Sequence, residues 1–499
     1  MRERLDSIAE LLAIVGIGLV LVLVPLVPGR EYLDVADLRL PIDSLVLAVP
    51  VALLLSVPLF RRIGALRLPH IGVEGPALVF LAVALVGVPL TGAGPAGIGT
   101  WLRYAGSVAL IPAVGALARS RGNRRLLLWV LVAGGAGSVL IGVLQYLNPT
   151  TIQLIGMQGL DQSVAGRIYS TYANPNFYSE YLVLLIGATL SLAFLEKGFL
   201  RGLAFALLAC EGFALLATYT RGSWLALAVG LLVAAVMIGR KYIWGLVGAA
   251  AVAAVAVPGV GQRIVSIFSM EGTASFRLRL WRLAGTIIQQ HLLLGVGIGR
   301  FISAFKLVSL EHPELGTGYL VYGAHNSYFT LTAETGILGG LAFVWLVASV
   351  MKMGVFYGER MGTDVSTKLQ NAALTVGLVA FAFNALTSNS FQHPQAAIFF
   401  WVLAGLQAGL GDEFWKRSAR PAASREQART GGILGGSVVL RMSRSFAGFV
   451  RGAWEYSDVH RWLVSVGPGD GTLLRTSRIV RLLLPARHRE RERELAESA

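Results

Sequence analysis

The chain has 499 residues, of which 55% are hydrophobic and only 14% are charged, and its mean hydropathy is +0.65. Soluble globular proteins carry about 25% charged residues, so this composition excludes a soluble protein and indicates one that crosses a membrane several times. A single cysteine and scattered histidines exclude a disulfide framework and a cysteine–histidine metal cluster. The net charge of +15 does not indicate nucleic-acid binding, because it lies mainly in the C-terminal tail and in short loops on one side of the membrane.

Apolar segments long enough to cross a bilayer recur along the chain. The first is too long for a typical signal peptide and has no convincing cleavage site, so we interpret it as a membrane span. We predict twelve spans, at residues 9–28, 42–60, 75–91, 98–118, 126–147, 176–195, 199–219, 222–239, 242–260, 324–355, 368–388 and 394–411. Basic residues concentrate in alternate loops, which predicts that both termini are cytoplasmic. The expected fold is an all-α polytopic membrane protein.

Three segments on the predicted outer side carry arginine, although basic residues are expected mainly in cytoplasmic loops. The loop 148–175 holds Arg167 and ends in Asn174-Pro175-Asn176, a pattern that indicates a capped helix start. A very short turn precedes Arg221 and must hold it close to the membrane surface. The third segment is the loop 261–323, whose length predicts structure or function of its own.

Within loop 261–323, four apolar residues share one face of a helix: Phe276, Leu280, Leu283 and Ile287. This spacing predicts an amphipathic helix that lies on the membrane surface and carries Arg277. The glycine-rich stretch 295–299 predicts a flexible turn before Arg300. It follows no predicted strand, so it is a weak signal for a phosphate-binding loop.

His325 and Asn326 stand at the outer start of the span 324–355. On a continuous helix, Gly336 and Gly339 would lie beneath His325 on one stripe, where a second helix could approach closely. Two interpretations of His325 are open: a residue that faces lipid headgroups, or a reactive imidazole. For Asn326 we expect that it caps the helix or orients the histidine.

Two carboxylates, Glu180 and Glu211, lie in apolar spans. An intramembrane carboxylate is a functional candidate by default, although an ion pair with Arg167 or Arg221 would explain Glu180 equally well. For Glu211 and for Arg103 we expect contacts between helices. Each outer arginine could likewise extend to lipid headgroups.

Two fixed arginines and a histidine on the outer face suit transfer from a diphosphate-linked substrate. The planar guanidinium of arginine matches phosphate oxygens and stays charged. A neutral imidazole can remove a proton from an attacking hydroxyl, and we expect Arg167 and Arg221 to lower the pKa of His325 below its ordinary value. The arginines would stabilise the leaving diphosphate without a metal, and no paired aspartates occur on an outer loop.

These residues resemble the O-antigen ligase and O-antigen polymerase superfamily of bacterial membrane glycosyltransferases, which includes some O-linked oligosaccharyltransferases. The resemblance covers about Arg167 to Gly340. Its most specific element is His325-Asn326, nine residues, Gly336, two residues and Gly339. Three further segments fit: Gly166-Arg167 with Asn174-Pro175-Asn176; Thr220-Arg221-Gly222, with threonine for the usual serine; and Arg277 to Trp281 followed by Gly295-Val296-Gly297.

The resemblance implies a C-type glycosyltransferase architecture, a polyprenyl-diphosphate glycan donor (undecaprenyl diphosphate), no metal and no cofactor. His325 would be the general base, with Arg167 and Arg221 as the other catalytic residues. The implied substrate-binding residues are Asn174, Asn176, Glu180, Arg277, Arg300 and Asn326. The acceptor would be a hydroxyl of a glycan, of a lipid-anchored group such as the lipid A core of lipopolysaccharide, or of a protein, on the outer face of the cytoplasmic membrane.

Two other classes of function fit the sequence less well. A lipid-linked glycan flippase or transporter would need a charged path through the bundle and repeat-related halves, whereas the charges here gather at one surface. A purely structural membrane protein does not explain the arginine and histidine set.

The chain divides into a transmembrane domain, residues 1–412, and a basic cytoplasmic tail, residues 413–499. Residues from about 438 to 454 have one apolar face and basic residues off it, which predicts a helix on the anionic inner leaflet. The last stretch, 488–497, has mixed charge and is predicted to be disordered. The tail is not part of the family pattern.

Overall fold

The computed structural model describes residues 2–26, 32–35, 38–41, 73–148, 166–172, 174–239, 273–315, 323–360 and 365–418. The described part is helical apart from one antiparallel hairpin, formed by β1 (Tyr32–Val35) and β2 (Leu38–Pro41). The helical architecture is therefore confirmed, with a small hairpin that we did not predict. The amphipathic helix expected near 438–454 and the disordered stretch lie outside the described residues.

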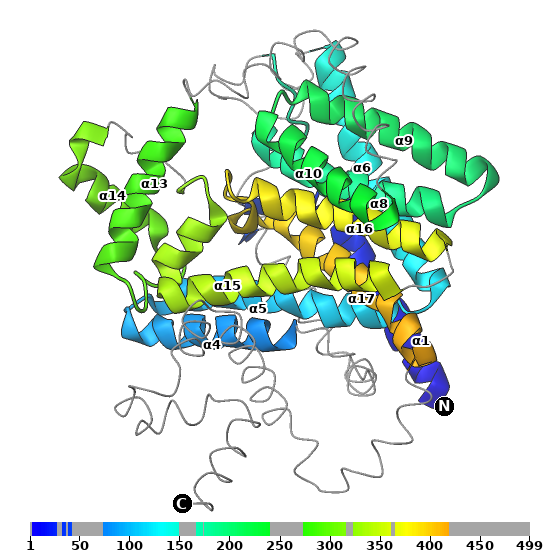
Figure 1. Cartoon of the computed structure of the whole chain (residues 1–499), viewed down its shortest axis with the longest axis horizontal. Coiled ribbons are helices and arrows are strands. Elements are labelled where there is room, and N and C mark those ends of the chain that lie inside the picture. Colours follow the sequence, from blue (N-terminus) through cyan, green and yellow to red (C-terminus); the bar gives the residue numbers. More distant parts are fainter. Residues whose placement is uncertain are drawn as a thin grey trace, which may run out of the picture. The chain divides into compact units, whose positions relative to one another are not determined.

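Figure 1 shows the arrangement of the helices. They are α1 (Arg2–Leu23), α4 (Glu74–Leu90), α5 (Gly94–Leu117), α6 (Arg121–Leu147), α8 (Pro175–Leu195), α9 (Gly198–Ala217), α10 (Arg221–Ile238), α13 (Thr273–Gln290), α14 (Phe301–Glu311), α15 (Ser327–Arg360), α16 (Val365–Asn384) and α17 (Pro394–Ser418). Two 3₁₀ turns, Pro313–Leu315 and Ser390–Gln392, follow α14 and precede α17.

In the described part of the chain, six helices are long and apolar enough to cross a membrane: α6, α8, α9, α10, α15 to Val355, and α17 to Gly411. These helices support a multi-pass membrane protein. The predicted spans 42–60 and 242–260 lie outside the described residues, and each of the others coincides with a helix. The count of twelve spans stays a prediction.

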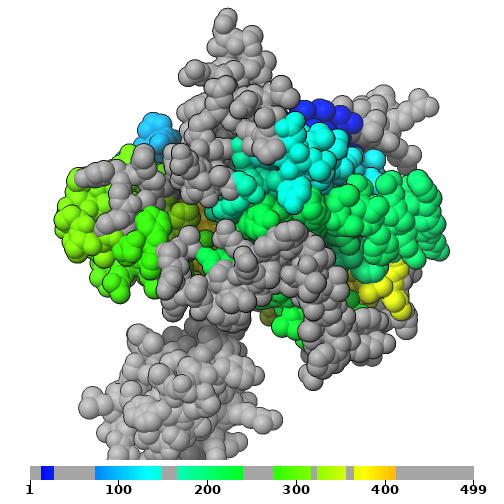
Figure 2. All heavy atoms as spheres, turned by 90° about the horizontal axis from the view of Figure 1, so that it is seen from above, coloured from blue at the N-terminus to red at the C-terminus, as the bar shows by residue number. Residues whose placement is uncertain are grey.

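Small residues let the central helices approach closely. α16 packs against α8 and α10, and α17 packs against α5. A Cβ atom on Gly187 of α8 would lie 2.8 Å from the Cα of Gly377 in α16, and one on Gly230 of α10 would lie 2.5 Å from the carbonyl oxygen of Val376. Because lipid tails are as apolar as leucine, close van der Waals packing of this kind is what holds membrane helices together. Figure 2 shows α6 and α9, which also pack together, side by side on one face.

Hydrogen bonds then join the ends of these helices. Ser179 of α8 and Ser223 of α10 share a hydrogen bond of 2.7 Å, and Asn384 Nδ2 at the end of α16 donates to Ser223 Oγ at 3.0 Å. The backbone N–H of Ser327, the first residue of α15, donates to the carbonyl of Ala385 at 2.8 Å. The N-terminal ends of α8, α10 and α15 therefore meet the C-terminal end of α16.

The amphipathic helix α13 forms as predicted, but its surroundings differ from the prediction. Its apolar face belongs to a buried cluster with α14 and the start of α15, made of Leu280, Leu283, Ala284, Ile287, Phe301, Phe305, Val308, Ala324 and Ala333. Leu280, Leu283 and Ile287 are fully buried. The expectation of a helix lying on the membrane surface was wrong, because α14 supplies a protein partner for the same face.

α15 is kinked at Gly336, which has φ 72° and ψ 178°. The carbonyls of Ala333 and Glu334 accept hydrogen bonds from the backbone N–H groups of Val296 and Gly297 at 2.9 and 3.0 Å, and the N–H of Ile337 donates to the carbonyl of Leu292 at 2.9 Å. A glycine kink inside a membrane helix is tolerated when neighbouring groups satisfy the freed backbone in this way. The turn 295–299 is therefore fastened to α15 rather than free, contrary to our prediction.

The kink also changes the role predicted for the glycine stripe. A Cβ atom on Gly336 would collide with the carbonyl of Leu293, so this glycine admits a loop and not a second helix. At Gly339 a helix does approach, because a Cβ there would lie 3.4 Å from Val83 of α4. The stripe prediction was right for Gly339 and wrong for Gly336, since it assumed an unbroken helix.

Candidate active site

Arg167 ties the start of α8 to the turn between α9 and α10. Its Nε donates to the carbonyl of Thr218 at 2.7 Å, and its Nη2 donates to Asn176 Oδ1 at 3.0 Å and to Thr220 Oγ1 at 2.9 Å. These three bonds fix the turn that precedes Arg221. The guanidinium of Arg167 is thus engaged with protein groups.

Asn174 caps α8, as the Asn-Pro-Asn pattern predicts. Its Oδ1 accepts a hydrogen bond from the backbone N–H of Asn176 at 2.8 Å, and Pro175 occupies the first helical position. An asparagine cap followed by proline stabilises a helix start because both satisfy or remove unpaired N–H donors. Asn174 and Asn176 are therefore structural parts of this corner.

Arg221 is the first residue of α10 and follows a tight turn. Tyr219 adopts a left-handed conformation with φ 49°, which lets the chain reverse direction within a few residues. A Cβ on Gly222 would lie 3.3 Å from Thr387 Oγ1, so the turn sits directly on the end of α16. The short turn places Arg221 at the meeting point of the helix ends, and its expected closeness to the membrane surface stays a prediction.

His325 stands just outside α15 in a left-handed conformation, with φ 48°. Asn326 Oδ1 accepts hydrogen bonds from the backbone N–H groups of Tyr328 and Phe329, both at 3.0 Å, so Asn326 caps the helix as expected. Because His325 is not helical, a helical projection cannot place it relative to the glycines. Non-glycine residues in this conformation are uncommon and cluster at functional sites.

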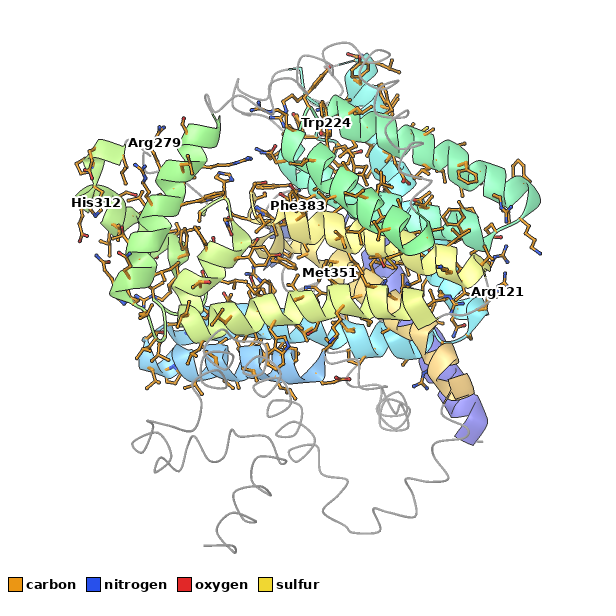
Figure 3. The ribbon with its side chains drawn as sticks, viewed as in Figure 1. Arg121, Trp224, Arg279, His312, Met351 and Phe383 are labelled. Carbon is orange, nitrogen blue, oxygen red and sulfur yellow. The ribbon has the colours of Figure 1, made fainter. Side chains whose placement is uncertain are left out.

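Arg277 of α13 is the residue around which the other charged groups gather. Burial lowers its pKa from the ordinary value, and so does the positive charge of Arg221, whereas the carboxylate of Glu180 opposes this effect. Burial and then the charge of Arg277 lower the pKa of His325 from 6.5 to about 4. The structure thus brings Arg221, Arg277, His325 and Glu180 together. In Figure 3, Arg279, Trp224 and Phe383 mark the parts of α13, α10 and α16 that surround this region.

We expected Arg167 and Arg221 to lower the pKa of His325. The pKa is lowered, but the cause that we expected was wrong. The larger cause is burial of the ring, and the charge that acts on it is that of Arg277. His325 is neutral at neutral pH, which is the state a general base needs.

The loop between α16 and α17 completes this region and was missed in the sequence. Ser327 Oγ donates to Gln392 Oε1 at 2.8 Å and accepts from the N–H of Phe391 at 3.1 Å. Ser388 Oγ donates to the carboxylate of Glu180, which is fully buried. A signal was present in the sequence. Residues 388–393 are mostly polar and lie between two apolar spans, and a proline follows His393, which is typical of a helix start.

His393 is a second histidine of this region. Its ring contacts that of Phe177 of α8, with 3.5 Å between the ring centres. Burial lowers the pKa of His393 to about 3, and protonated His325 and the charge of Arg103 act in the same direction. Arg103 therefore contributes charge near this site, beyond the helix contact that we expected.

The candidates Arg300 and Glu211 lie elsewhere, as does Glu334, which the sequence did not single out. Arg300 follows the far end of α13, and its Nη1 donates to the carbonyl of Thr91 at 2.8 Å beside a separate cavity of about 720 Å³. Glu334 Oε1 accepts from the N–H of Phe301 at 3.2 Å. Thr189 Oγ1 donates to Glu211 Oε1 at 2.6 Å, which confirms a contact between helices. Arg300 is thus apart from the group around Arg277.

The described residues contain no cluster of three or more histidine, cysteine, aspartate or glutamate side chains that could hold a metal ion. The chemical groups of this region are guanidinium, imidazole, carboxyl and hydroxyl. Together they can bind an anion, accept a proton and form hydrogen bonds to hydroxyl groups.

The family model described as O-antigen ligase matches residues 203–344. This part of the chain is similar to the O-antigen ligase family. The match covers Arg221, Arg277 and His325, and it confirms the resemblance seen in the motifs. Arg167, α8 and the loop between α16 and α17 lie outside the O-antigen ligase match. A comparison with curated proteins found no match to the chain.

Proposed function

We propose that the protein is a membrane glycosyltransferase that moves a glycan from a polyprenyl diphosphate to an acceptor hydroxyl, in the manner of an O-antigen ligase or polymerase. The observation that carries this proposal is the convergence of Arg221, Arg277 and His325, all within the O-antigen ligase match: the charge of Arg221 acts on Arg277, and that of Arg277 acts on His325. The proposed location is the outer face of the cytoplasmic membrane.

Arg221 and Arg277 bind the diphosphate in this proposal. Burial lowers the pKa of Arg277, and the charge of Arg221 lowers it further, because two positive charges in a partly buried place disfavour each other. An anion placed between them removes this repulsion. Guanidinium groups also match phosphate oxygens with paired hydrogen bonds, and they stabilise the charge that develops on the leaving diphosphate.

His325 acts as the general base. The acceptor hydroxyl gives its proton to the neutral imidazole while its oxygen forms a bond to the anomeric carbon of the donor sugar. The bond from that carbon to the diphosphate oxygen breaks, and its electron pair leaves on the diphosphate beside Arg221 and Arg277. The bound diphosphate offsets the charge of Arg277, which raises the pKa of His325 toward the working pH and improves it as a base.

The remaining residues have supporting roles. Arg167 holds the turn before Arg221 through Thr218 and Thr220, so we assign it as a positioning residue. Asn174 and Asn326 cap α8 and α15 and so fix the two helix starts. Asn176 anchors Arg167, Glu180 balances part of the positive charge, and Arg300 has no role in the donor site.

The test is a transfer assay with purified protein in lipid nanodiscs and a polyprenyl-diphosphate glycan. Three acceptors are supplied separately: lipid A core, a second polyprenyl-diphosphate glycan, and a serine-rich peptide. Mass spectrometry of a glycosylated product from one acceptor identifies ligase, polymerase or protein transfer. If the folded protein makes no product but moves the donor across vesicle membranes, the flippase alternative holds instead.

A further inference from the structure

The loop between α16 and α17 carries two buried polar atoms that the proposed mechanism does not use. Among the residues that the structure describes, His393 Nε2 and Asn389 Oδ1 are buried and make no hydrogen bond. Buried polar groups almost always have a partner, so each unsatisfied one needs an explanation. These two stand at the two ends of the 3₁₀ turn Ser390–Gln392.

Both residues are held against the segment that carries His325. A Cβ on Gly323 would collide with the amide of Asn389, so this amide packs against the chain two residues before His325. On the other side, Ser327 bonds to Gln392, the neighbour of His393, and Ser327 lies two residues after His325. His325 also acts electrostatically on His393. The segment 323–327 around His325 is therefore flanked by the loop that carries Asn389 and His393.

The backbone of His393 is anchored and its ring packs against a neighbouring ring. It packs against Phe177, and the carbonyl of His393 accepts hydrogen bonds from the N–H groups of Ala396 and Ala397 at 3.1 and 2.9 Å. Asn389 is 3% exposed, and its carbonyl accepts from the N–H of Gln392 at 2.9 Å. Two fixed polar groups beside a general base form a preorganised place for a substrate group.

The chemistry of the two atoms indicates the kind of group. A neutral imidazole nitrogen and an amide oxygen are both uncharged, so they suit a neutral partner with hydroxyl groups rather than a phosphate. A hydroxyl can donate to Asn389 Oδ1 and either donate to or accept from His393 Nε2. The cationic side chains Arg221 and Arg277, which suit the diphosphate, lie on α10 and α13 instead.

We propose that His393 and Asn389 form a subsite that binds a sugar hydroxyl of the acceptor glycan and holds the neighbouring hydroxyl beside His325. This inference rests on the proposed function and deepens it, because it names a glycan as the acceptor. A glycan acceptor fits a ligase or polymerase and not transfer to a peptide.

The test compares the parent with His393→Phe, which keeps a ring against Phe177 and removes both nitrogens. With the acceptor glycan at varied concentration, we expect the KM for acceptor to rise about tenfold while the KM for donor stays at the parental value. His393→Gln, which keeps a nitrogen donor, should recover part of the loss. The control is His312→Phe, because the side chain of His312 is 38% exposed and follows α14, away from the loop that carries His393.

A second measurement identifies the hydroxyl. Acceptor glycans that lack one hydroxyl at a time are compared in the parent and in His393→Phe, with thermal unfolding recorded for both. For the parent, one deoxy acceptor should have a higher KM than the complete glycan. For His393→Phe, the same deoxy acceptor and the complete glycan should have equal KM values. If the parent transfers and both His393 variants keep the parental KM for acceptor, the subsite is wrong while the proposed function stands. If the folded parent transfers to no acceptor, both proposals fall.

Discussion

The charge of Arg277 acts on the imidazole of His325: burial of the ring and, after it, that charge lower the pKa of His325 to about 4. Arg277 lies on α13 and His325 just before α15, and both lie within the O-antigen ligase match. This pair links the proposed donor site to the proposed base, because an anion bound at Arg277 changes the proton affinity of His325.

The pH dependence of transfer follows from this pair. In the free protein His325 becomes protonated only as pH falls through about 4, so kcat/KM should stay high at pH 5 and 6 and fall below that. Bound diphosphate raises the pKa of His325, so the acid limb of kcat should lie at higher pH than that of kcat/KM. Rates measured from pH 3.5 to 8 check this. Acid limbs of kcat and kcat/KM at the same pH would contradict the coupling.

Arg277→Ala should impair donor use and also alter the base. Loss of one charged hydrogen-bonding group costs roughly 1.5–3 kcal/mol, so kcat/KM for donor should fall about 10- to 100-fold. The acid limb of kcat/KM should move to higher pH because a positive charge beside His325 is gone. Arg277→Lys should return the acid limb of kcat/KM to its parental pH more fully than it restores the rate, since lysine keeps the charge but not the planar geometry.

The matched control for Arg277 is Arg282→Ala on the same helix, at an exposed position. This variant should keep the parental rate and the parental pH profile. Equal losses in the two variants would mean that α13 contributes general positive charge and no specific diphosphate contact.

Arg167→Ala should loosen the turn before Arg221. The variant loses three hydrogen bonds from a charged donor, so hydrogen exchange at residues 218–222 should quicken and kcat should fall. Arg167→Lys can replace one of these bonds and should rescue only partly. An Arg167→Ala protein with unchanged exchange in this turn and a large loss of donor binding would instead assign Arg167 directly to the diphosphate.

Gly336→Ala should destabilise the protein through the backbone. At this position φ is 72°, and a Cβ would collide with the carbonyl of Leu293, so the fastening of the turn 295–299 to α15 would break. Strain of this kind costs about 1–3 kcal/mol before the collision is counted. Gly285→Ala is the control, because a Cβ on Gly285 of α13 meets nothing within 4 Å. Thermal unfolding in detergent should separate the two, and equal midpoints would refute the argument.

The sequence predicts local structure well where one helix or turn decides the outcome. Apolar runs predict the helices, and the Asn-Pro-Asn pattern predicts the cap made by Asn174. The amphipathic spacing of α13 also predicts the helix itself. These features depend on residues that are neighbours in the chain.

Relationships between distant segments could not be predicted. The apolar face of α13 fits a membrane surface and a protein partner equally well, and only the folded chain shows α14 packed there. The kink at Gly336 depends on the loop 292–297, and the contact of His393 with Phe177 depends on how α8 and α17 pack. For the same reason the family motif gave His325 but not the loop that flanks it.

The most direct test of the account is single-turnover transfer with the donor bound beforehand, comparing the parent with His325→Ala at pH 7. General-base catalysis is worth about 10²- to 10⁴-fold, so His325→Ala should slow transfer by that factor while donor binding, which depends on Arg221 and Arg277, stays at the parental level. A His325→Ala protein that transfers the glycan at the parental rate would contradict the central claim.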